Sequence, residues 1–126
     1  VDPFPPVEQL YRVTEKVLAT ALELGYPLII NTKSVFYTHQ QLKNYIEKLL
    51  DSRLAVLQIS IPTLVSRAAE KLEPRAPDPE KRLGVLRDLG STDIPLVLRL
   101  SPFIPHISPT SENDVEHFAG LCSAEI

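Results

Sequence analysis

Three apolar runs of this chain end alike, because each passes directly into small polar or charged residues. The runs cover residues 28–31, 54–59 and 96–100. They alternate with segments of helical spacing, and no hairpin turn such as Asn-Gly lies between them, which favours parallel strands joined by right-handed crossovers. In a parallel α/β sheet the carboxyl ends of the strands meet at one edge, where such folds place ligands. We therefore expect Lys33, Ser60 and Ser101, which follow these runs, to lie at one edge of the sheet.

Apolar residues spaced three and four apart predict the helices between these strands. The helices are expected at about residues 7–22, 38–50, 62–72, 78–89 and 111–121. Gly25 ends the first helix, Thr38 caps the second together with Gln41, and Asp78 caps the helix that restarts after a Pro-rich stretch. The buried face of the first helix is expected to contain Val7, Leu10, Tyr11, Val17, Leu18, Ala21 and Leu22. Residues 123–126 are expected to form a strand that is cut short.

The composition is that of one globular domain, with 126 residues of which 44% are hydrophobic. The formal charge of −3 is small and the basic residues are scattered among acids, so no basic stripe predicts binding to a phosphate backbone. The single Cys122 cannot form an internal disulfide, and no cysteine or histidine pair has metal-site spacing. No apolar run approaches the roughly 20 residues of a membrane span. We therefore expect a cytoplasmic, reducing location.

A sheet of three parallel strands is unusual by itself, because parallel strands are normally covered on both faces and flanked by further strands. Unpaired apolar edge strands promote association with other chains. The chain also contains no methionine, which fits either removal of the initiator residue or a piece of a longer protein. We therefore expect an α/β fold that forms an arc of a partial, TIM-like parallel barrel.

Five strings at or near the predicted strand ends occur in an order that resembles one known family. They are Asp2-Pro3-Phe4-Pro5-Pro6-Val7-Glu8; Thr32-Lys33-Ser34; Ile59-Ser60-Ile61; Glu73-Pro74-Arg75-Ala76-Pro77 with Pro79-Glu80-Lys81-Arg82-Leu83; and Ser101-Pro102-Phe103-Ile104-Pro105. Together they resemble the radical S-adenosylmethionine proteins related to spore photoproduct lyase. The resemblance implies that residues 1–126 form part of a (βα)6 barrel, from the loop after its second strand to the start of its sixth.

The resemblance also implies a chemistry. Family members bind a [4Fe-4S] cluster through three cysteines spaced Cys-x3-Cys-x2-Cys, cleave S-adenosylmethionine reductively and abstract hydrogen from a substrate, which in DNA repair enzymes is a nucleic-acid lesion. Iron of this kind requires thiolate ligands. The only cysteine here is Cys122, so the chain by itself is not expected to assemble the cluster or to be active. It would contribute part of the cofactor-binding wall.

The resemblance assigns the polar residues of the first three strings to the methionyl part of the cofactor. Asp2 and Glu8 would approach its amino group, Lys33 would lie near its carboxylate, and Ser60 would contribute a hydroxyl to its carboxylate or ribose. Structural alternatives exist for each position. The acidic residues would equally suit a helix entry loop, Lys33 a solvated loop, and Ser60 a turn.

The resemblance assigns the last strings to the rest of the cofactor. Arg82 would reach a carboxylate, although a solvated position on a helix surface is the alternative. Ser101 and Pro102 would line the adenine through backbone groups, because prolines hold an extended course. The string then departs from the family, which commonly has glycine at the position of His106.

Two other interpretations stay open. Lys33 at a strand end could form a Schiff base, as in class I aldolase-like barrels, although no paired acid or base is evident in the sequence. Alternatively, the chain is a non-catalytic barrel segment that self-associates through its open strand edges.

Overall fold

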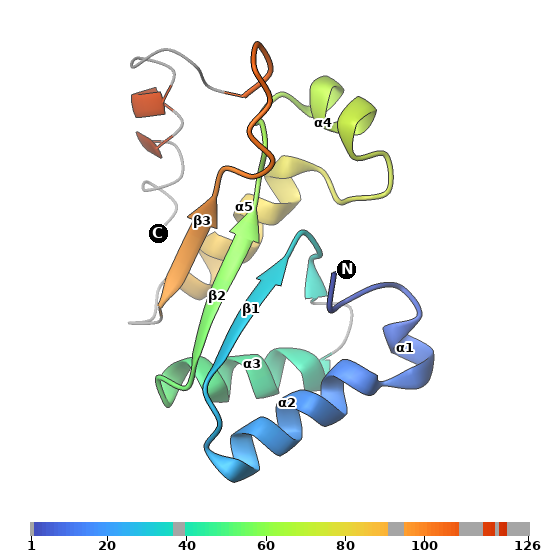
Figure 1. Cartoon of the computed structure of the whole chain (residues 1–126), viewed down its shortest axis with the longest axis vertical. Helices are drawn as coiled ribbons and strands as arrows, with labels where there is room; N and C mark the ends of the chain where they lie inside the picture. Colours follow the sequence, from blue (N-terminus) through green and yellow to red (C-terminus); the bar gives the residue numbers. More distant parts are fainter. Residues whose placement is uncertain (1, 37–39, 91–94, 109–114, 118, 121–126) are drawn as a thin grey trace.

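The computed structural model describes residues 2–36, 40–90, 95–108, 115–117 and 119–120 (Figure 1). These residues form an open, mixed α/β arrangement in which helices alternate with strands. The elements are α1 (Glu8–Tyr11), α2 (Val13–Leu24), β1 (Leu28–Thr32), α3 (Gln40–Asp51), β2 (Ala55–Ser60), α4 (Ser66–Leu72), α5 (Pro79–Gly90) and β3 (Leu96–Arg99). No helix in these ranges combines the length and the apolar composition needed to cross a membrane.

The three strands form one sheet in the order β1-β2-β3, and both pairings are parallel. Leu28 lies opposite Ala55 in the first pair, and Leu57 lies opposite Leu96 in the second. The prediction of three parallel strands separated by helices is therefore confirmed. The arrows in Figure 1 point the same way, so the carboxyl ends of the strands share one edge.

Helices α3 and α5 lie behind the sheet in the view of Figure 1 and cover one of its faces, and α2 packs against α3. Alternate residues of each strand, such as Ile30, Leu57 and Leu98, face these helices and belong to the hydrophobic core or pack against it. The opposite face carries the other residues of each strand. We call it the open face, and it consists of Ile29, Asn31, Val56, Gln58, Ser60, Val97 and Arg99.

The prediction of one continuous first helix is wrong, because the helix breaks at Arg12. Arg12 has φ 51° and ψ 39°, a left-handed conformation that ends α1 and begins α2. Its guanidinium donates hydrogen bonds of 2.7 and 2.6 Å to the Glu15 carboxylate. Such a bidentate pair helps to hold a backbone conformation that is unfavourable for residues other than glycine.

The break also makes part of the predicted buried face wrong. Leu18 and Ala21 are buried and Leu22 packs against the core, as expected. Four other members of that face are more than half exposed, because α1 and the start of α2 do not continue one helical surface. They are Val7, Leu10, Tyr11 and Val17.

The next helix after β2 begins later than the predicted residue 62. The Ile61 amide donates a 2.9 Å hydrogen bond to the Arg99 carbonyl, so the chain continues along β3 beyond the end of β2. The Val65 amide then donates to the Thr63 hydroxyl at 3.2 Å, which forms a turn before α4 starts at Ser66. Sequence periodicity does not report such tertiary hydrogen bonds. The predicted cap at Thr38, the helix start near residues 111–114, Cys122 and the strand at 123–126 lie outside the described residues.

Candidate functional site

The carboxyl edge of the sheet carries three of the residues singled out in the sequence. Ser60 ends β2 and lies opposite Arg99 of β3, Lys33 follows the last residue of β1, and Ser101 follows β3 by two residues. The expectation that Lys33, Ser60 and Ser101 lie at one edge therefore agrees with the parallel register.

A charged network crosses this edge and consists of Lys33, Glu73 and Arg82. The Glu73 carboxylate accepts a hydrogen bond from the Lys33 ammonium and another, at 2.8 Å, from Arg82 Nη2. Arg82 also donates at 2.7 Å to the main-chain oxygen of Ser60 and at 2.8 Å to that of Pro77. Its side chain is only 1% exposed, so the alternative of a solvated surface arginine is wrong. Two cations share one carboxylate, which leaves the network with net positive charge.

Opposing effects act on the Glu73 carboxyl. Burial raises its pKa, but the hydrogen bonds and charges of Lys33 and Arg82 together outweigh burial, so the pKa of Glu73 lies below its ordinary value. The carboxylate therefore stays ionised and keeps the segment before α5 attached to the ends of β1 and β2.

Asp2 attaches the amino-terminal loop to the same edge. Its carboxylate accepts hydrogen bonds from the Phe4 amide at 2.9 Å, the Thr32 hydroxyl at 2.8 and 3.0 Å, and the Lys33 amide at 2.6 Å. These contacts give Asp2 a structural role at the end of β1. Its predicted contact with a cofactor amino group stays a prediction.

Glu8 also has a structural role. Its side chain is buried, and Oε1 accepts a 2.9 Å hydrogen bond from the Glu15 amide in the first turn of α2. A carboxylate at this position satisfies an otherwise unpaired amide and interacts favourably with the helix dipole. The acidic position therefore supports the entry into the helix, and its contact with a cofactor stays a prediction.

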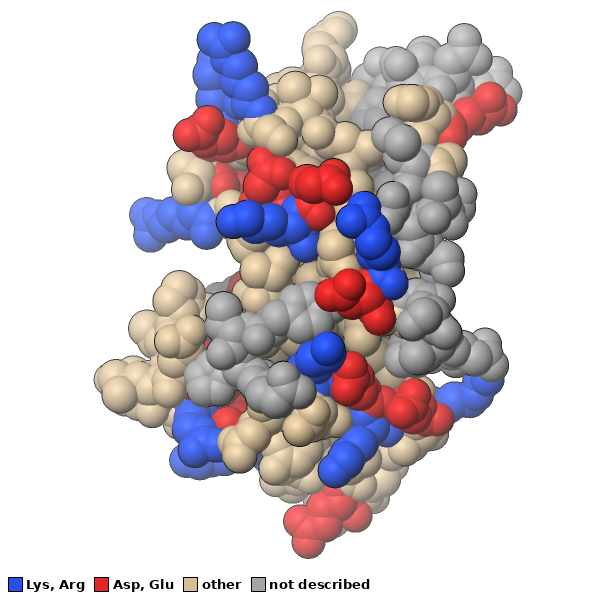
Figure 2. Space-filling model, turned by 180° about the vertical axis from the view of Figure 1, so that it is seen from behind, with Lys and Arg blue, Asp and Glu red and all other residues tan. Residues whose placement is uncertain are grey.

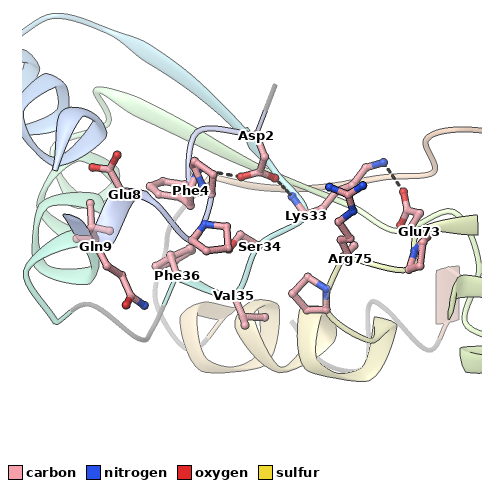
Figure 3. Close-up of a pocket in the computed structure, with 16 residues that line it drawn as sticks. Asp2, Phe4, Glu8, Gln9, Lys33, Ser34, Val35, Phe36, Glu73 and Arg75 are labelled. Carbon is pink, nitrogen blue, oxygen red and sulfur yellow. Dashed lines mark hydrogen bonds and ion pairs between the residues drawn. The ribbon is translucent and has the colours of Figure 1, made fainter. Parts of the chain in front are cut away.

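A cleft of about 780 Å³ lies between the amino-terminal loop, the loop after β1 and the segment before α5 (Figure 3). Its walls are mainly apolar, and the residues that supply them are Phe4, Pro5, Pro6, Val35, Phe36, Leu42, Pro74, Ala76 and Pro77. Lys33, Glu73 and Arg75 lie toward one end, and Glu8 and Gln9 toward the other. Arg75 forms no hydrogen bond or ion pair with any described residue. The cleft therefore combines apolar walls with two cations and the Glu73 carboxylate at one end.

Ser101 and Pro102 lie apart from this cleft. The Ser101 amide donates a 3.0 Å hydrogen bond to the Arg99 carbonyl, and the peptide bond between Ser101 and Pro102 is cis. No hydrogen bond given for the described residues joins either of them to the charged network. Their predicted contacts with adenine stay predictions.

The open face carries a second polar group that the sequence analysis did not single out. Arg99 Nη1 donates a 3.1 Å hydrogen bond to Asn31 Oδ1, which links β3 to β1 across β2. Both side chains are exposed. Strict alternation along β1 and β3 could have placed Asn31 and Arg99 opposite the core. The role of Glu73 had no comparable local signal, because its two partners are 40 and 9 residues away.

The helical side of the molecule, opposite the open face, carries charged side chains of both signs. Figure 2 shows basic and acidic side chains interspersed across this side of the molecule. Mixed charge of this kind is typical of an ordinary solvated surface. The candidate binding residues therefore lie at the carboxyl edge of the sheet and on the open face.

Comparison with known proteins found one informative relationship. No protein-family model matches the chain, and no solved structure matches it significantly. The chain is 36% identical over 106 residues to the uncharacterized protein ORF301 of Acidianus two-tailed virus, an alignment that covers 82% of this chain and 33% of the viral protein. The chain thus spans about a third of the length of this relative, whose name assigns no activity.

Proposed function

We propose that this chain is part of the cofactor-binding wall of a radical S-adenosylmethionine protein similar to spore photoproduct lyase. The proposal includes the finer fold assignment, an arc of a partial (βα)6 barrel. Three parallel strands with helices on one face and an open opposite face support this assignment, because barrel segments have this arrangement.

One observation carries the functional proposal. The cleft is lined by residues of three strings on which the family resemblance rests, namely the strings that begin at Asp2, Thr32 and Glu73. Arg82 joins the string around Ser60 to the same edge through its hydrogen bond to the Ser60 carbonyl. Segments that are far apart in the sequence thus meet where parallel folds bind ligands.

The residues at this edge fit part of the cofactor. The Lys33 ammonium suits the methionyl carboxylate, and apolar walls suit an adenosine group. S-adenosylmethionine, when bound to a reduced cluster, supplies hydrogen abstraction from a substrate. The cluster itself does not fit this chain, whose single cysteine cannot provide three thiolate ligands. Those ligands would have to come from outside these 126 residues.

The test uses the genomic reading frame that contains this sequence. A Cys-x3-Cys-x2-Cys motif is expected upstream, within roughly the 80 to 100 residues that two βα units need. The longer protein, purified without oxygen and reconstituted with iron and sulfide, should bind S-adenosylmethionine and release 5′-deoxyadenosine on reduction. Lack of both the motif and the cleavage would refute the proposal.

Two variants of the longer protein test the role of Lys33. Lys33→Met should weaken binding of S-adenosylmethionine by about tenfold, because a charge-assisted contact to the carboxylate is lost. The control Lys43→Met replaces a lysine of α3, away from the cleft, and should leave binding unchanged. Equal affinities for the two variants would remove Lys33 from the cofactor site.

The alternative functions have separate tests. Borohydride trapping of a small carbonyl compound on Lys33 would favour the Schiff-base interpretation. Concentration-dependent sedimentation of the 126-residue chain would favour self-association through the outer edges of β1 and β3.

A further inference from the structure

The open face has an uneven distribution of polarity. Nearest the amino ends of the strands it carries Ile29, which is 69% exposed, and Val56. The next row along the register carries Asn31, Gln58 and Val97, the last of which is 38% exposed, and Arg99 lies opposite Ser60 at the carboxyl end. Exposed apolar residues rimmed by polar groups are a feature of interaction surfaces.

Arg99 carries a positive charge that no described residue neutralises. No carboxylate of a described residue forms an ion pair with it, and its hydrogen bond within these residues goes to the neutral amide of Asn31. This hydrogen bond uses Nη1, so other N–H donors of the guanidinium can bind a further acceptor. Asn31 thus orients a cation whose remaining donors can bind an anionic ligand.

The neighbouring positions leave Arg99 as the cation that a ligand on the open face can reach. Ser60 lies directly opposite Arg99. Because Thr32 lies opposite Ile59, the next residue of the first strand, Lys33, is level with Ser60. Lys33 and Arg82 share the Glu73 carboxylate, and the Asp2 carboxylate accepts a hydrogen bond from the Lys33 amide. Lys33 itself is already paired with Glu73, whereas Arg99 has no acidic partner among the described residues. Arg99 is therefore the anion-binding group of the open face.

We propose that the open face binds a small molecule that combines an apolar ring or chain with a carboxylate or phosphate group. Arg99 binds the anionic group through its free guanidinium donors, Asn31 orients Arg99, and Ile29, Val56 and Val97 contact the apolar part. The planar guanidinium fits both carboxylate and phosphate oxygens through paired hydrogen bonds. This inference does not depend on radical chemistry or on S-adenosylmethionine.

The experiment uses the 126-residue chain and the side-chain Nε–H signals of its arginines in ¹H–¹⁵N spectra. The probes are two matched pairs at constant ionic strength, acetate with benzoate and inorganic phosphate with phenyl phosphate. The Arg99 signal should shift saturably, and the member of each pair that carries a ring should bind more tightly. The more tightly bound pair identifies the anion as carboxylate or phosphate. The signal of Arg67, an exposed arginine of α4, should show no saturation.

Variants separate ligand binding from a purely structural role of the hydrogen bond between Arg99 and Asn31. Arg99→Gln should weaken benzoate or phenyl phosphate binding by about tenfold or more. Asn31→Ala should weaken it less and leave the chain folded, and Ile29→Ser should remove the advantage of the ring without affecting acetate or phosphate. The control Arg67→Gln should change none of these affinities.

Two results would overturn the proposal. One is an Arg99 signal that moves no more than that of Arg67 with any of the four probes. The other is an Asn31→Ala protein that loses thermal stability but retains the full anion response, because the pair would then only connect β1 to β3.

Discussion

Arg82 Nη2 lies 2.8 Å from Glu73 Oε2, and the two side chains are 1% and 9% exposed. This buried ion pair connects α5 to the segment that precedes it. It also lies between Lys33 and the end of β2, because Glu73 binds the lysine and Arg82 binds the Ser60 carbonyl. Stability and site geometry at the carboxyl edge therefore depend on the same pair.

Replacing Arg82 should strongly destabilise the fold. Arg82→Met leaves the Glu73 carboxylate with one partner and removes the donor from the carbonyls of Ser60 and Pro77. Removing one partner of a buried pair costs about 3 kcal/mol. Urea denaturation followed by circular dichroism measures the change. The control Arg67→Met, on the exposed surface of α4, should change the free energy of unfolding by no more than about 0.5 kcal/mol, and similar losses in both variants would contradict the prediction.

The stability should fall in acid, in part through Glu73. Its folded-state pKa lies below the ordinary value of 4.5, so its ionised form stabilises the fold above the unfolded-state pKa. This contribution is lost as the pH falls through the folded-state pKa. The difference in unfolding free energy between the wild type and Glu73→Gln should be largest near about pH 6 to 7 and should shrink below pH 4.5.

Asp78 provides the comparison for this pH dependence. Its pKa is also lowered, first by a hydrogen bond from the Glu80 amide and then by the Ser66 side chain. Asp78→Asn should therefore remove the contribution of Asp78 to the pH dependence of stability and leave the contribution of Glu73 in place.

A Glu73→Gln protein whose stability has the same pH dependence as the wild type would show that the network of Lys33, Glu73 and Arg82 does not stabilise the fold.

Asp2 should stabilise the attachment of the amino-terminal loop to the end of β1. Asp2→Ala removes the acceptor of the Lys33 amide and of the Thr32 hydroxyl. Because hydrogen bonds to a charged group contribute about 1.5 to 3 kcal/mol, the Lys33 amide should lose at least about tenfold of its protection from hydrogen exchange. The control Asp88→Ala, at an exposed position of α5, should leave this protection unchanged, and equal protection in both variants would contradict the structural role of Asp2.

Arg53 occupies a helix end at which glycine should be more stable than alanine. The Arg53 amide donates to the Leu50 carbonyl at 2.9 Å, and the Leu54 amide donates to the Leu49 carbonyl at 2.9 Å, which is the hydrogen-bond pattern of a Schellman motif. Arg53 has φ 54°, a conformation that favours glycine. Arg53→Gly should therefore be more stable than Arg53→Ala by about 1 kcal/mol.

Gly25 provides the reverse comparison. It has φ 64° at the end of α2, and a Cβ atom there would meet no atom within 4 Å. Gly25→Ala should therefore lose about 1 kcal/mol through the backbone alone. Thermal or urea denaturation of the three variants measures both effects, and an Arg53→Gly protein no more stable than Arg53→Ala would contradict this assignment.

Local patterns were sufficient to predict the main elements of the fold. The alternation of apolar runs with helical periodicity predicted three parallel strands in the correct segments, because the spacing of apolar residues reflects burial directly. The same patterns predicted that Lys33, Ser60 and Ser101 meet at one edge, since this follows from parallel direction alone. They did not predict the break at Arg12, which depends on contacts made by charged side chains.

The pairing of polar groups at that edge could not be deduced from neighbouring residues. Glu73 lies in a Pro-rich stretch without periodicity, and its contacts with Lys33 and Arg82 exist only once the chain is folded. The pair of Asn31 and Arg99 likewise joins residues 68 positions apart. Burial of apolar side chains is non-directional and produces a periodic pattern of apolar residues in the sequence. A hydrogen bond, in contrast, depends on the distance and angle between two particular atoms. Folding alone brings those atoms together.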